Sequence, residues 1–317
     1  MEHRKTPTGA LWALLASLIF SVNDTLIKFL SDGYALHQIV FTRSLTGVLL
    51  LVIVIIPFSG GYGGLRTQRL GLHLVRSLFV VAANLFFYMA LADLPLAIVV
   101  AIFFIAPFLI TIFSVIFLGE TVGKWRWLAV VVGLIGVLLI VRPGTAAFTL
   151  TSILPALAAL CYASFHILTR KIGQTETLMS LTFYVPLVFL VVTTVIGLTL
   201  GQGGFAGDGH RSVEFLLRAW QWPSWADLSL MVFIGIGVTV GGAAISQAYR
   251  VAEAALVAPF EYTSLVYATI LGYLLFAEWP DLYEWSGMSL VLISGLVTVW
   301  RERVNARPRV APPNSPR

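Results

Sequence analysis

The sequence predicts an all-helical membrane protein with ten spanning helices, and three observations support this prediction. Of its 317 residues, 58% are hydrophobic and 11% are charged, with a mean hydropathy of +0.91. Soluble proteins carry about 25% charged residues, so lipid rather than water is the main solvent predicted for this surface. The apolar residues form long runs, and Lys and Arg are distributed unevenly between the segments that join these runs.

A helix needs about 20 predominantly apolar residues to cross the hydrocarbon core of a bilayer. The stretches predicted to cross are 9–30, 36–57, 73–91, 96–118, 125–141, 150–170, 178–200, 227–250, 254–276 and 284–300. The first is expected to be a retained helix, because it is longer than the apolar part of a signal peptide and contains Asp24 and Lys28. The longest loop, 201–226, ends in tryptophans that suit a membrane interface.

The positive charges predict the orientation. With the N-terminus in the cytoplasm, the cytoplasmic segments hold fifteen Lys and Arg residues and the opposite segments hold four. Because cytoplasmic loops are enriched in these residues, we expect both termini in the cytoplasm. The tail 301–317 is basic and rich in proline, so it is predicted to be disordered near anionic lipid headgroups. The net charge of +5 therefore reflects membrane orientation and does not indicate nucleic-acid binding.

An internal repeat divides the chain into halves at 1–144 and 145–300. Segment 90–121 aligns with 248–279 at an offset of 158, and the first helix aligns with the sixth at an offset of 142. The pairs that these offsets relate include Thr111 with Thr269, Glu120 with Glu278, Asp24 with His166, and Lys28 with Arg170. Because each half has five predicted helices, the halves should insert with opposite topology. Inverted repeats are characteristic of secondary transporters, whose binding site lies near the bilayer midplane.

Several motifs resemble one family. The matching stretches are FTRSLTG (41–47), VRSLFVVAANLFFYMALADLPLAIVVAIFFIAPFLITIFSVIFLGE (75–120), KWRWLAVVVGLIGVLLIVRPG (124–144) and, less closely, APFEYTSLVYATILGYLLFAEW (258–279). With these stretches the chain resembles the EamA branch of the drug/metabolite transporter superfamily. The resemblance implies ten helices around a central cavity, alternating access and no cofactor. One departure is Val185, which stands at the repeat position of Arg43.

Charged residues inside the predicted helices are candidates for function, because a charge at the centre of a bilayer costs about 2.5–3.5 kcal/mol or more. Glu261 lies at mid-depth and could bind a substrate cation or carry a proton; the alternative is an ion pair with an arginine. Asp24 and His166 are further substrate and proton-coupling candidates. For Asp24 the alternative is neutralisation by Lys28 at i+4, and for His166 it is an ordinary buried hydrogen bond.

Arginine offers a second kind of site. Arg43 could hold a carboxylate or phosphate through its two-pronged guanidinium, or it could neutralise Asp24 or Glu261. The resemblance favours the structural role, because this arginine recurs in the family across differing substrates. Arg76 is expected to reach the headgroups at the membrane surface. The neutral candidates for substrate binding, whose polar groups need partners when buried, are Asn84, Tyr88, Tyr162, Gln247, Tyr262 and Tyr267.

Two further sets of residues are expected to shape the helix bundle. The repeat-related residues Glu120 and Glu278 lie at helix ends, where we interpret them as helix-terminus or gate residues. Small residues allow close helix packing in lipid. The glycines expected to do so are Gly133, Gly136, Gly287 and Gly295, which pack either within the monomer or at a homodimer face.

These features favour a secondary transporter in the plasma membrane, which in bacteria is the inner membrane. Its expected partners are membrane lipids and a small polar substrate, which is amino-acid-like, zwitterionic or aromatic. Uptake or exchange of a vitamin or nucleoside-like compound is the alternative. A channel or scramblase is a hypothesis of another class. An intramembrane enzyme is disfavoured, because the five histidines are scattered without metal-ligand spacing. The single cysteine, Cys161, allows no internal disulfide.

Overall fold

The computed structural model describes residues 5–58, 61–145, 148–172, 175–204, 210–251 and 260–305, and within these ranges the secondary structure is helical, without strands. The helices are α1 (Lys5–Leu30), α2 (Leu36–Leu50), α3 (Ile56–Phe58), α4 (Leu70–Leu91), α5 (Leu96–Phe103), α6 (Ala106–Leu118), α7 (Lys124–Val141), α8 (Ile153–Ile172), α9 (Leu178–Leu200), α10 (Arg211–Leu217), α11 (Trp225–Val251), α13 (Thr263–Phe276) and α14 (Leu282–Asn305). The all-helical class is thus confirmed.

The described residues contain eight segments long and apolar enough to cross a membrane, and two shorter apolar helices, Thr263–Phe276 and Leu282–Thr298. These two helices occupy the positions of the predicted ninth and tenth spans. The predicted ninth span begins at residue 254, which lies outside the described residues. Ten crossings therefore stay a prediction, whereas a multi-pass membrane protein is established.

The outer surface of the bundle is apolar. Large side chains such as Leu198 and Leu274 are 74% and 68% exposed, which a soluble protein of this kind would bury. Trp222 and Trp225 are almost fully exposed beside α10, in the segment whose tryptophans the sequence assigns to an interface. The short helix α10 was not predicted there. α14 continues to Asn305, so the start of the tail predicted to be disordered is helical.

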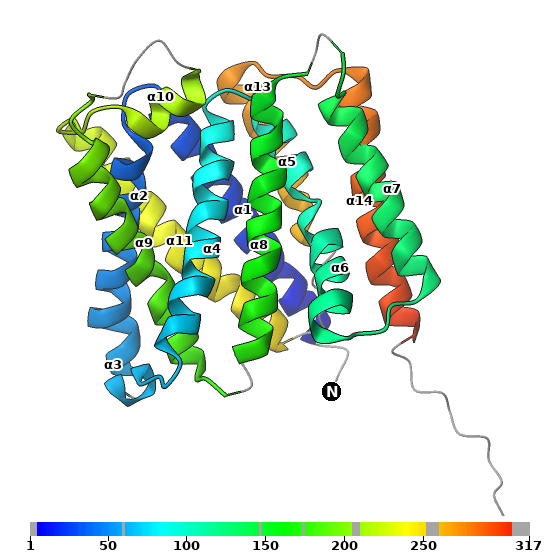
Figure 1. The fold of residues 1–317 in the computed structure, drawn as a ribbon, viewed down its shortest axis with the longest axis horizontal. Coiled ribbons are helices and arrows are strands. Elements are labelled where there is room, and N and C mark those ends of the chain that lie inside the picture. The colour runs from blue at the N-terminus through cyan, green and yellow to red at the C-terminus, as the bar shows by residue number, and fades with distance from the viewer. Residues whose placement is uncertain are drawn as a thin grey trace, which may run out of the picture.

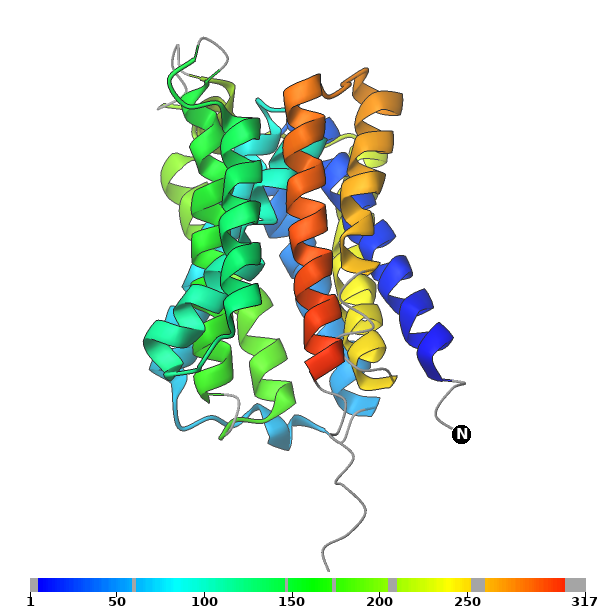
Figure 2. The same cartoon turned by 90° about the vertical axis from the view of Figure 1, so that its right-hand side faces the viewer.

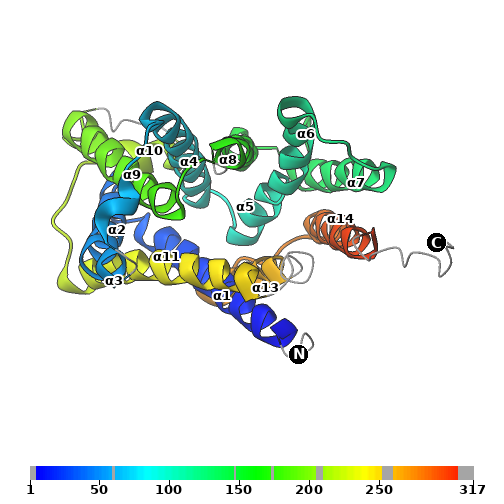
Figure 3. The same cartoon turned by 90° about the horizontal axis from the view of Figure 1, so that it is seen from below.

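The helices form two rows, which Figure 3 shows from below. One row contains α9, α4, α8, α6 and α7, the other contains α2, α11, α1, α13 and α14, and α5 lies between them. α1 begins and α14 ends at the same end of the bundle (Figures 1 and 2). We call this the terminal end and the opposite one the far end. The charge distribution predicts that the terminal end is cytoplasmic.

Each row combines helices from both sequence halves. α1 packs on α11 and α8 on α4; α6 contacts α8 and α13 contacts α1; α2 contacts α11 and α9 contacts α4. The repeat relates α1 to α8, α2 to α9, α4 to α11, α6 to α13 and α7 to α14. When each helix is exchanged for its counterpart, α1–α11 becomes α8–α4, α6–α8 becomes α13–α1, and α2–α11 becomes α9–α4. The contacts of α2 with α9 and of α7 with α14 are converted into themselves. The counterpart of α5 is the stretch 254–261, which lies mostly outside the described residues, so the contact of α5 with α13 cannot be compared in this way.

The predicted fourth helix is interrupted near its middle. α5 ends at Phe103 and α6 begins at Ala106, with Phe104 and Ile105 in a turn. Pro107 sits in the first turn of α6, where a missing N–H is tolerated. A similar turn at Tyr262 precedes α13.

Phe104 and Tyr262 are related by the repeat offset of 158. Their rings stack with centroids 4.8 Å apart. The two breaks therefore meet between the rows, at positions that the repeat makes equivalent.

Glycines allow the closest helix contacts. A Cβ built on Gly136 would lie 2.8 Å from the carbonyl oxygen of Gly287, so α7 and α14 cross backbone to backbone. A Cβ on Gly133 would overlap the ring of Phe108, and one on Gly295 would overlap Tyr262. All four predicted packing glycines thus make contacts within the monomer.

Candidate functional site

Arg43 is the centre of a polar cluster between α2 and α4. Its side chain is 5% exposed. One guanidinium nitrogen donates to the Tyr88 hydroxyl oxygen at 2.7 Å, and the other donates to Asn84 Oδ1 at 3.3 Å. The guanidinium also lies over the rings of Tyr88 and Phe189, at 5.3 and 5.2 Å from their centroids. Three predicted candidates are thus brought together.

Asp24 faces this cluster from α1. It is half-buried, and its carboxylate interacts electrostatically with Arg43 and Tyr88. Lys28, the expected i+4 partner, instead pairs with Glu278 Oε1, at an Nζ–Oε1 distance of 2.6 Å. The alternative of a local Asp24–Lys28 ion pair is therefore wrong, because Lys28 at the end of α1 reaches the residue just after α13. Asp24 keeps Arg43 as its nearby opposite charge.

An aromatic path leads from this cluster toward α8. The rings of Tyr88 and Phe87 meet edge-on with their centroids 5.7 Å apart. The centroid distances of the next two steps are 5.1 Å from Phe87 to Phe103 and 5.3 Å from Phe103 to Tyr162. Tyr162 in turn packs on His166 at 4.4 Å. Phe87 and Phe103 were not predicted as site residues. The only signal in the sequence is that Phe87 directly precedes Tyr88, and no sequence feature distinguishes Phe103.

Glu261 lies directly before the turn at Tyr262. It is half-buried, and its charge acts on Tyr162 and on Tyr262. Glu261 thus faces the end of the aromatic path that is remote from Arg43. The hydroxyl of Tyr262 is turned against Gly295 on α14.

Arg76 corrects the expectation of a headgroup contact. Its side chain is 1% exposed and points inward, where it donates to Thr169 Oγ1 at 3.3 Å and to the Leu181 carbonyl at 2.7 Å. It lies over the Phe165 ring and acts electrostatically on His166, whose buried Nε2 has no hydrogen-bond partner among the described residues. Arg76 therefore ties α4 to α8 and α9 rather than α4 to lipid.

The two remaining candidates lie apart from the cluster. Gln247 is half-buried near the end of α11, and Tyr267 is half-buried in the first turns of α13. Neither contacts Arg43, Tyr162 or Glu261 through a described hydrogen bond. The residues that the fold gathers around the path are thus Asp24, Arg43, Asn84, Tyr88, Tyr162, His166 and Glu261.

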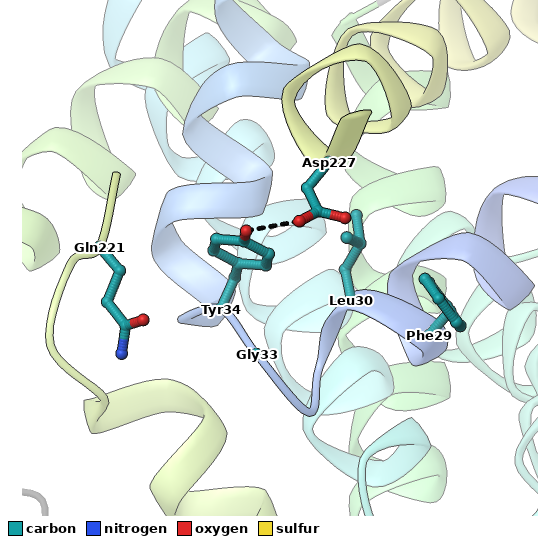
Figure 4. A pocket seen from close by; sticks show the side chains of 6 residues that line it. All are labelled: Phe29, Leu30, Gly33, Tyr34, Gln221 and Asp227. Carbon is teal, nitrogen blue, oxygen red and sulfur yellow. Dashed lines mark hydrogen bonds between the residues drawn. The ribbon is translucent and has the colours of Figure 1, made fainter. Parts of the chain in front are cut away.

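A small pocket of about 280 Å³ opens at the far end, away from these residues. Figure 4 shows its lining, in which the Tyr34 hydroxyl donates to Asp227 Oδ2 at 2.6 Å. This hydrogen bond, followed by partial burial, raises the pKa of Tyr34 above its usual value. The contact holds the turn after α1 against the start of α11. We therefore interpret the Tyr34–Asp227 contact as structural and the central cluster as the candidate site.

At the terminal end, Glu176 joins two connecting segments. Its carboxylate lies 3.2 Å from His73 Nε2. Partial burial alone would raise the pKa of Glu176, but the hydroxyls of Thr67 and Ser180 and the neighbouring His73 ring outweigh it and lower this pKa. Thr177 beside it donates to the Gly64 carbonyl at 2.6 Å. These contacts tie the segment between α8 and α9 to the first turn of α4 and to the segment before it.

Comparison with known proteins identifies the family. Residues 7–142 match the model of the EamA-like transporter family. The riboflavin transporter of Vibrio cholerae is 30% identical over 308 residues, which cover 95% of this chain and 96% of that protein. The S-adenosylmethionine uptake transporter of Rickettsia felis is 26% identical, covering 93% and 94%. The pseudopaline exporter of Pseudomonas aeruginosa is 27% identical, covering 90% and 94%.

The fold agrees with this comparison. A solved crystal structure that is 17% identical superposes with a TM-score of 0.59 over 96% of this chain and all of that one. Together with the apolar helices, these similarities indicate a multi-pass protein of the bacterial inner membrane that carries a small molecule. The chain belongs to the EamA-like transporters of the drug/metabolite transporter superfamily, and it is a transporter rather than an enzyme.

Proposed function

We propose that this protein is a secondary transporter of a small polar metabolite with a flat aromatic ring, which binds where the two interrupted helices meet between the rows. The observation that carries the proposal is the stacked pair Phe104–Tyr262 at two repeat-equivalent helix breaks. Helix breaks free backbone groups for binding, and in membrane transporters they mark the substrate site. Glu261 lies directly before Tyr262 at this point.

The helix pairing supports alternating access between the proposed halves 1–144 and 145–300. Among the helices whose repeat counterparts the structure describes, each large contact is converted by the repeat into another large contact or into itself, as expected of two similar units inserted with opposite topology. Two such units can exchange conformations, and the exchange would move the opening from one end of the bundle to the other while the binding point stays fixed.

The aromatic path supports a planar cargo. Phe87, Phe103 and Tyr162 follow one another at centroid distances of 5.1 and 5.3 Å, so a flat ring could insert beside them and stack. Riboflavin and S-adenosylmethionine, for which two relatives are named, both contain such a ring. The sequence leaves two substrate classes open, an amino-acid-like compound and a vitamin-like or nucleoside-like compound. Because the second class contains a flat ring, it is tested first.

The charges support a zwitterionic variant of the same cargo. Arg43 lies at one end of the path beside Asp24, and Glu261 lies at the other end beside Tyr162. A carboxylate would be held by Arg43 through two hydrogen bonds, and an ammonium or sulfonium group by Glu261. Glu261, Asp24 and His166 are proposed to carry the coupling proton, because carboxylate and imidazole groups titrate at or below neutral pH in water and these three face or contact the path.

The test is counterflow in proteoliposomes that contain the purified protein. Vesicles loaded with unlabelled riboflavin should accumulate external labelled riboflavin transiently above equilibrium, because a carrier exchanges one molecule for another. S-adenosylmethionine and a panel of amino acids are measured in the same way. Flux that is unaffected by internal substrate would indicate a pore and contradict the proposal. Failure of every ring-containing compound, with success of an aliphatic amino acid, would contradict the aromatic cargo.

A further inference from the structure

Two ion pairs stand at opposite ends of the bundle. At the far end Lys28, in the last turn of α1, pairs with Glu278 just after α13, with Nζ and Oε1 2.6 Å apart. At the terminal end Arg170, in the last turn of α8, pairs with Glu120 just after α6, with Nη2 and Oε1 2.5 Å apart. Each pair connects one helix end with the end of an interrupted span.

These two ion pairs are the same interaction repeated. The offset of 142 relates Lys28 to Arg170, and the offset of 158 relates Glu120 to Glu278. Each pair joins a cation and a carboxylate that come from different halves. The two offsets, which align the halves of the sequence, therefore also relate the two ion pairs to each other.

The two pairs differ in their exposure. The side chains of Lys28 and Glu278 are 10% and 21% exposed, whereas those of Arg170 and Glu120 are 54% and 34% exposed. At the far end the contact is extended, because Lys28 also donates to the Leu94 carbonyl and Glu278 Oε2 accepts from the Leu96 amide at 2.9 Å. The far end is thus tied together across α1, α5 and α13, while the terminal end is accessible to water at its pair.

We propose that Lys28–Glu278 and Arg170–Glu120 are two gates that close the far and terminal ends of the transport path in alternation. Both ion pairs are formed in the structure, which therefore represents a state closed at both ends, with the far gate more deeply buried than the terminal gate. Breaking one pair should shift the population toward the state open at that end. This inference rests on the proposed alternating access, but its test requires no cargo.

The test measures the accessibility of one cysteine from each side. Cys161 is replaced by serine, and a reporter cysteine is placed at Phe103, which is half-buried at the break after α5. Vesicles of known orientation are treated with a membrane-impermeant maleimide from one side at a time. Glu278→Gln should raise labelling from the far side on the order of tenfold and lower it from the terminal side.

Glu120→Gln should shift labelling in the opposite sense, by about two- to threefold, because an exposed ion pair is weaker. The matched control is Asp281→Asn, which removes the far-end ion pair with Arg142. The residue at the repeat position of Arg142 is Trp300, so this pair has no counterpart. Labelling in the control should stay unchanged.

The exchanged pair Lys28→Glu/Glu278→Lys keeps the attraction with reversed polarity but loses the hydrogen bonds to the Leu94 carbonyl and the Leu96 amide. It should therefore lower far-side labelling part of the way from the Glu278→Gln value toward that of the parent. Labelling that changes in the same direction for Glu120→Gln and Glu278→Gln, or equally in the Asp281→Asn control, would show that the pairs only stabilise the fold. If Glu278→Gln does not fold, Lys28→Gln takes its place, and far-side labelling equal to that of the parent overturns the proposal. Counterflow can fail while this asymmetry holds, so the two proposals are tested separately.

Discussion

Replacing Gly295 by alanine should destabilise the protein through a clash at the centre of the bundle. The added Cβ would lie 2.0 Å from the Tyr262 hydroxyl oxygen and 2.2 Å from its Cζ. The ring is buried and stacks on Phe104, so it can escape only by leaving that stack. Overpacking costs about 1–3 kcal/mol, and disrupting the ring stack costs about 0.5–1.5 kcal/mol. The gain in helix propensity offsets at most about 1 kcal/mol of this.

The net loss of about 1–3 kcal/mol should lower the melting temperature of the purified protein by about 1.5–4.5 °C, because the entropy of unfolding grows with chain length. Gly242→Ala is the matched control, because nothing lies within 4 Å of a Cβ built there, and its melting temperature should stay equal or rise. Tyr262→Leu combined with Gly295→Ala should recover part of the loss. A Gly295→Ala protein that melts with the parent would refute the described packing of Tyr262.

Three other variants test the polar contacts. Arg43→Lys keeps the charge but cannot form both hydrogen bonds to Tyr88 and Asn84; it should raise the counterflow KM by about tenfold or more, and an unchanged KM at unchanged melting temperature would remove Arg43 from the site. Glu261→Gln should abolish or uncouple transport while leaving the melting temperature near that of the parent; normal transport with the parental pH profile would exclude Glu261 as a proton carrier. Glu176→Gln tests the terminal-end contact by its pH dependence. The folded-state pKa of Glu176 is lowered, so its stabilisation is complete above the unfolded-state pKa of about 4.3 and is lost as the pH falls through the lower folded value. The parent should therefore melt above Glu176→Gln at pH 7 and converge with it in acid, and a constant difference down to that range would contradict the assignment.

The helix positions were largely predictable because hydropathy records them directly. The predicted span 178–200 coincides with α9 (Leu178–Leu200). The interruption between α5 and α6 was not predictable, because the residues on both sides of it are equally apolar and Pro107 is compatible with the first turn of a helix. Hydropathy reflects the free energy of moving side chains from water into lipid. A helix break depends instead on which backbone carbonyls have a hydrogen-bond donor.

The candidate site was predictable in its members but not in their contacts. Arg43, Asn84 and Tyr88 were each selected as polar residues within a span, and the structure joins them by hydrogen bonds. The local ion pair of Asp24 with Lys28 was the alternative to a functional role for Asp24, and it does not form because Lys28 pairs with the distant Glu278. The expected headgroup contact of Arg76 was wrong for the same reason. The hydrogen-bond acceptors of its guanidinium lie on α8 and α9, about a hundred positions further along the chain.

The break between α5 and α6 also affects the energetic cost of the charges around it. In a continuous helix the carbonyl of Phe103 would accept from the amide of residue 107, but Pro107 has none. The Ile105 amide bonds to Ile102 instead of Ala101, which leaves a second carbonyl without its helical donor. Backbone groups at membrane depth need polar partners, and where no donor from the chain is present, that partner is water or cargo. Water held at this point would raise the local dielectric constant, and this would lower the desolvation penalty of Glu261, which lies beside the repeat-equivalent break. An interruption of the helical hydrogen bonds would thus make it easier for the same fold to hold charged residues inside the membrane.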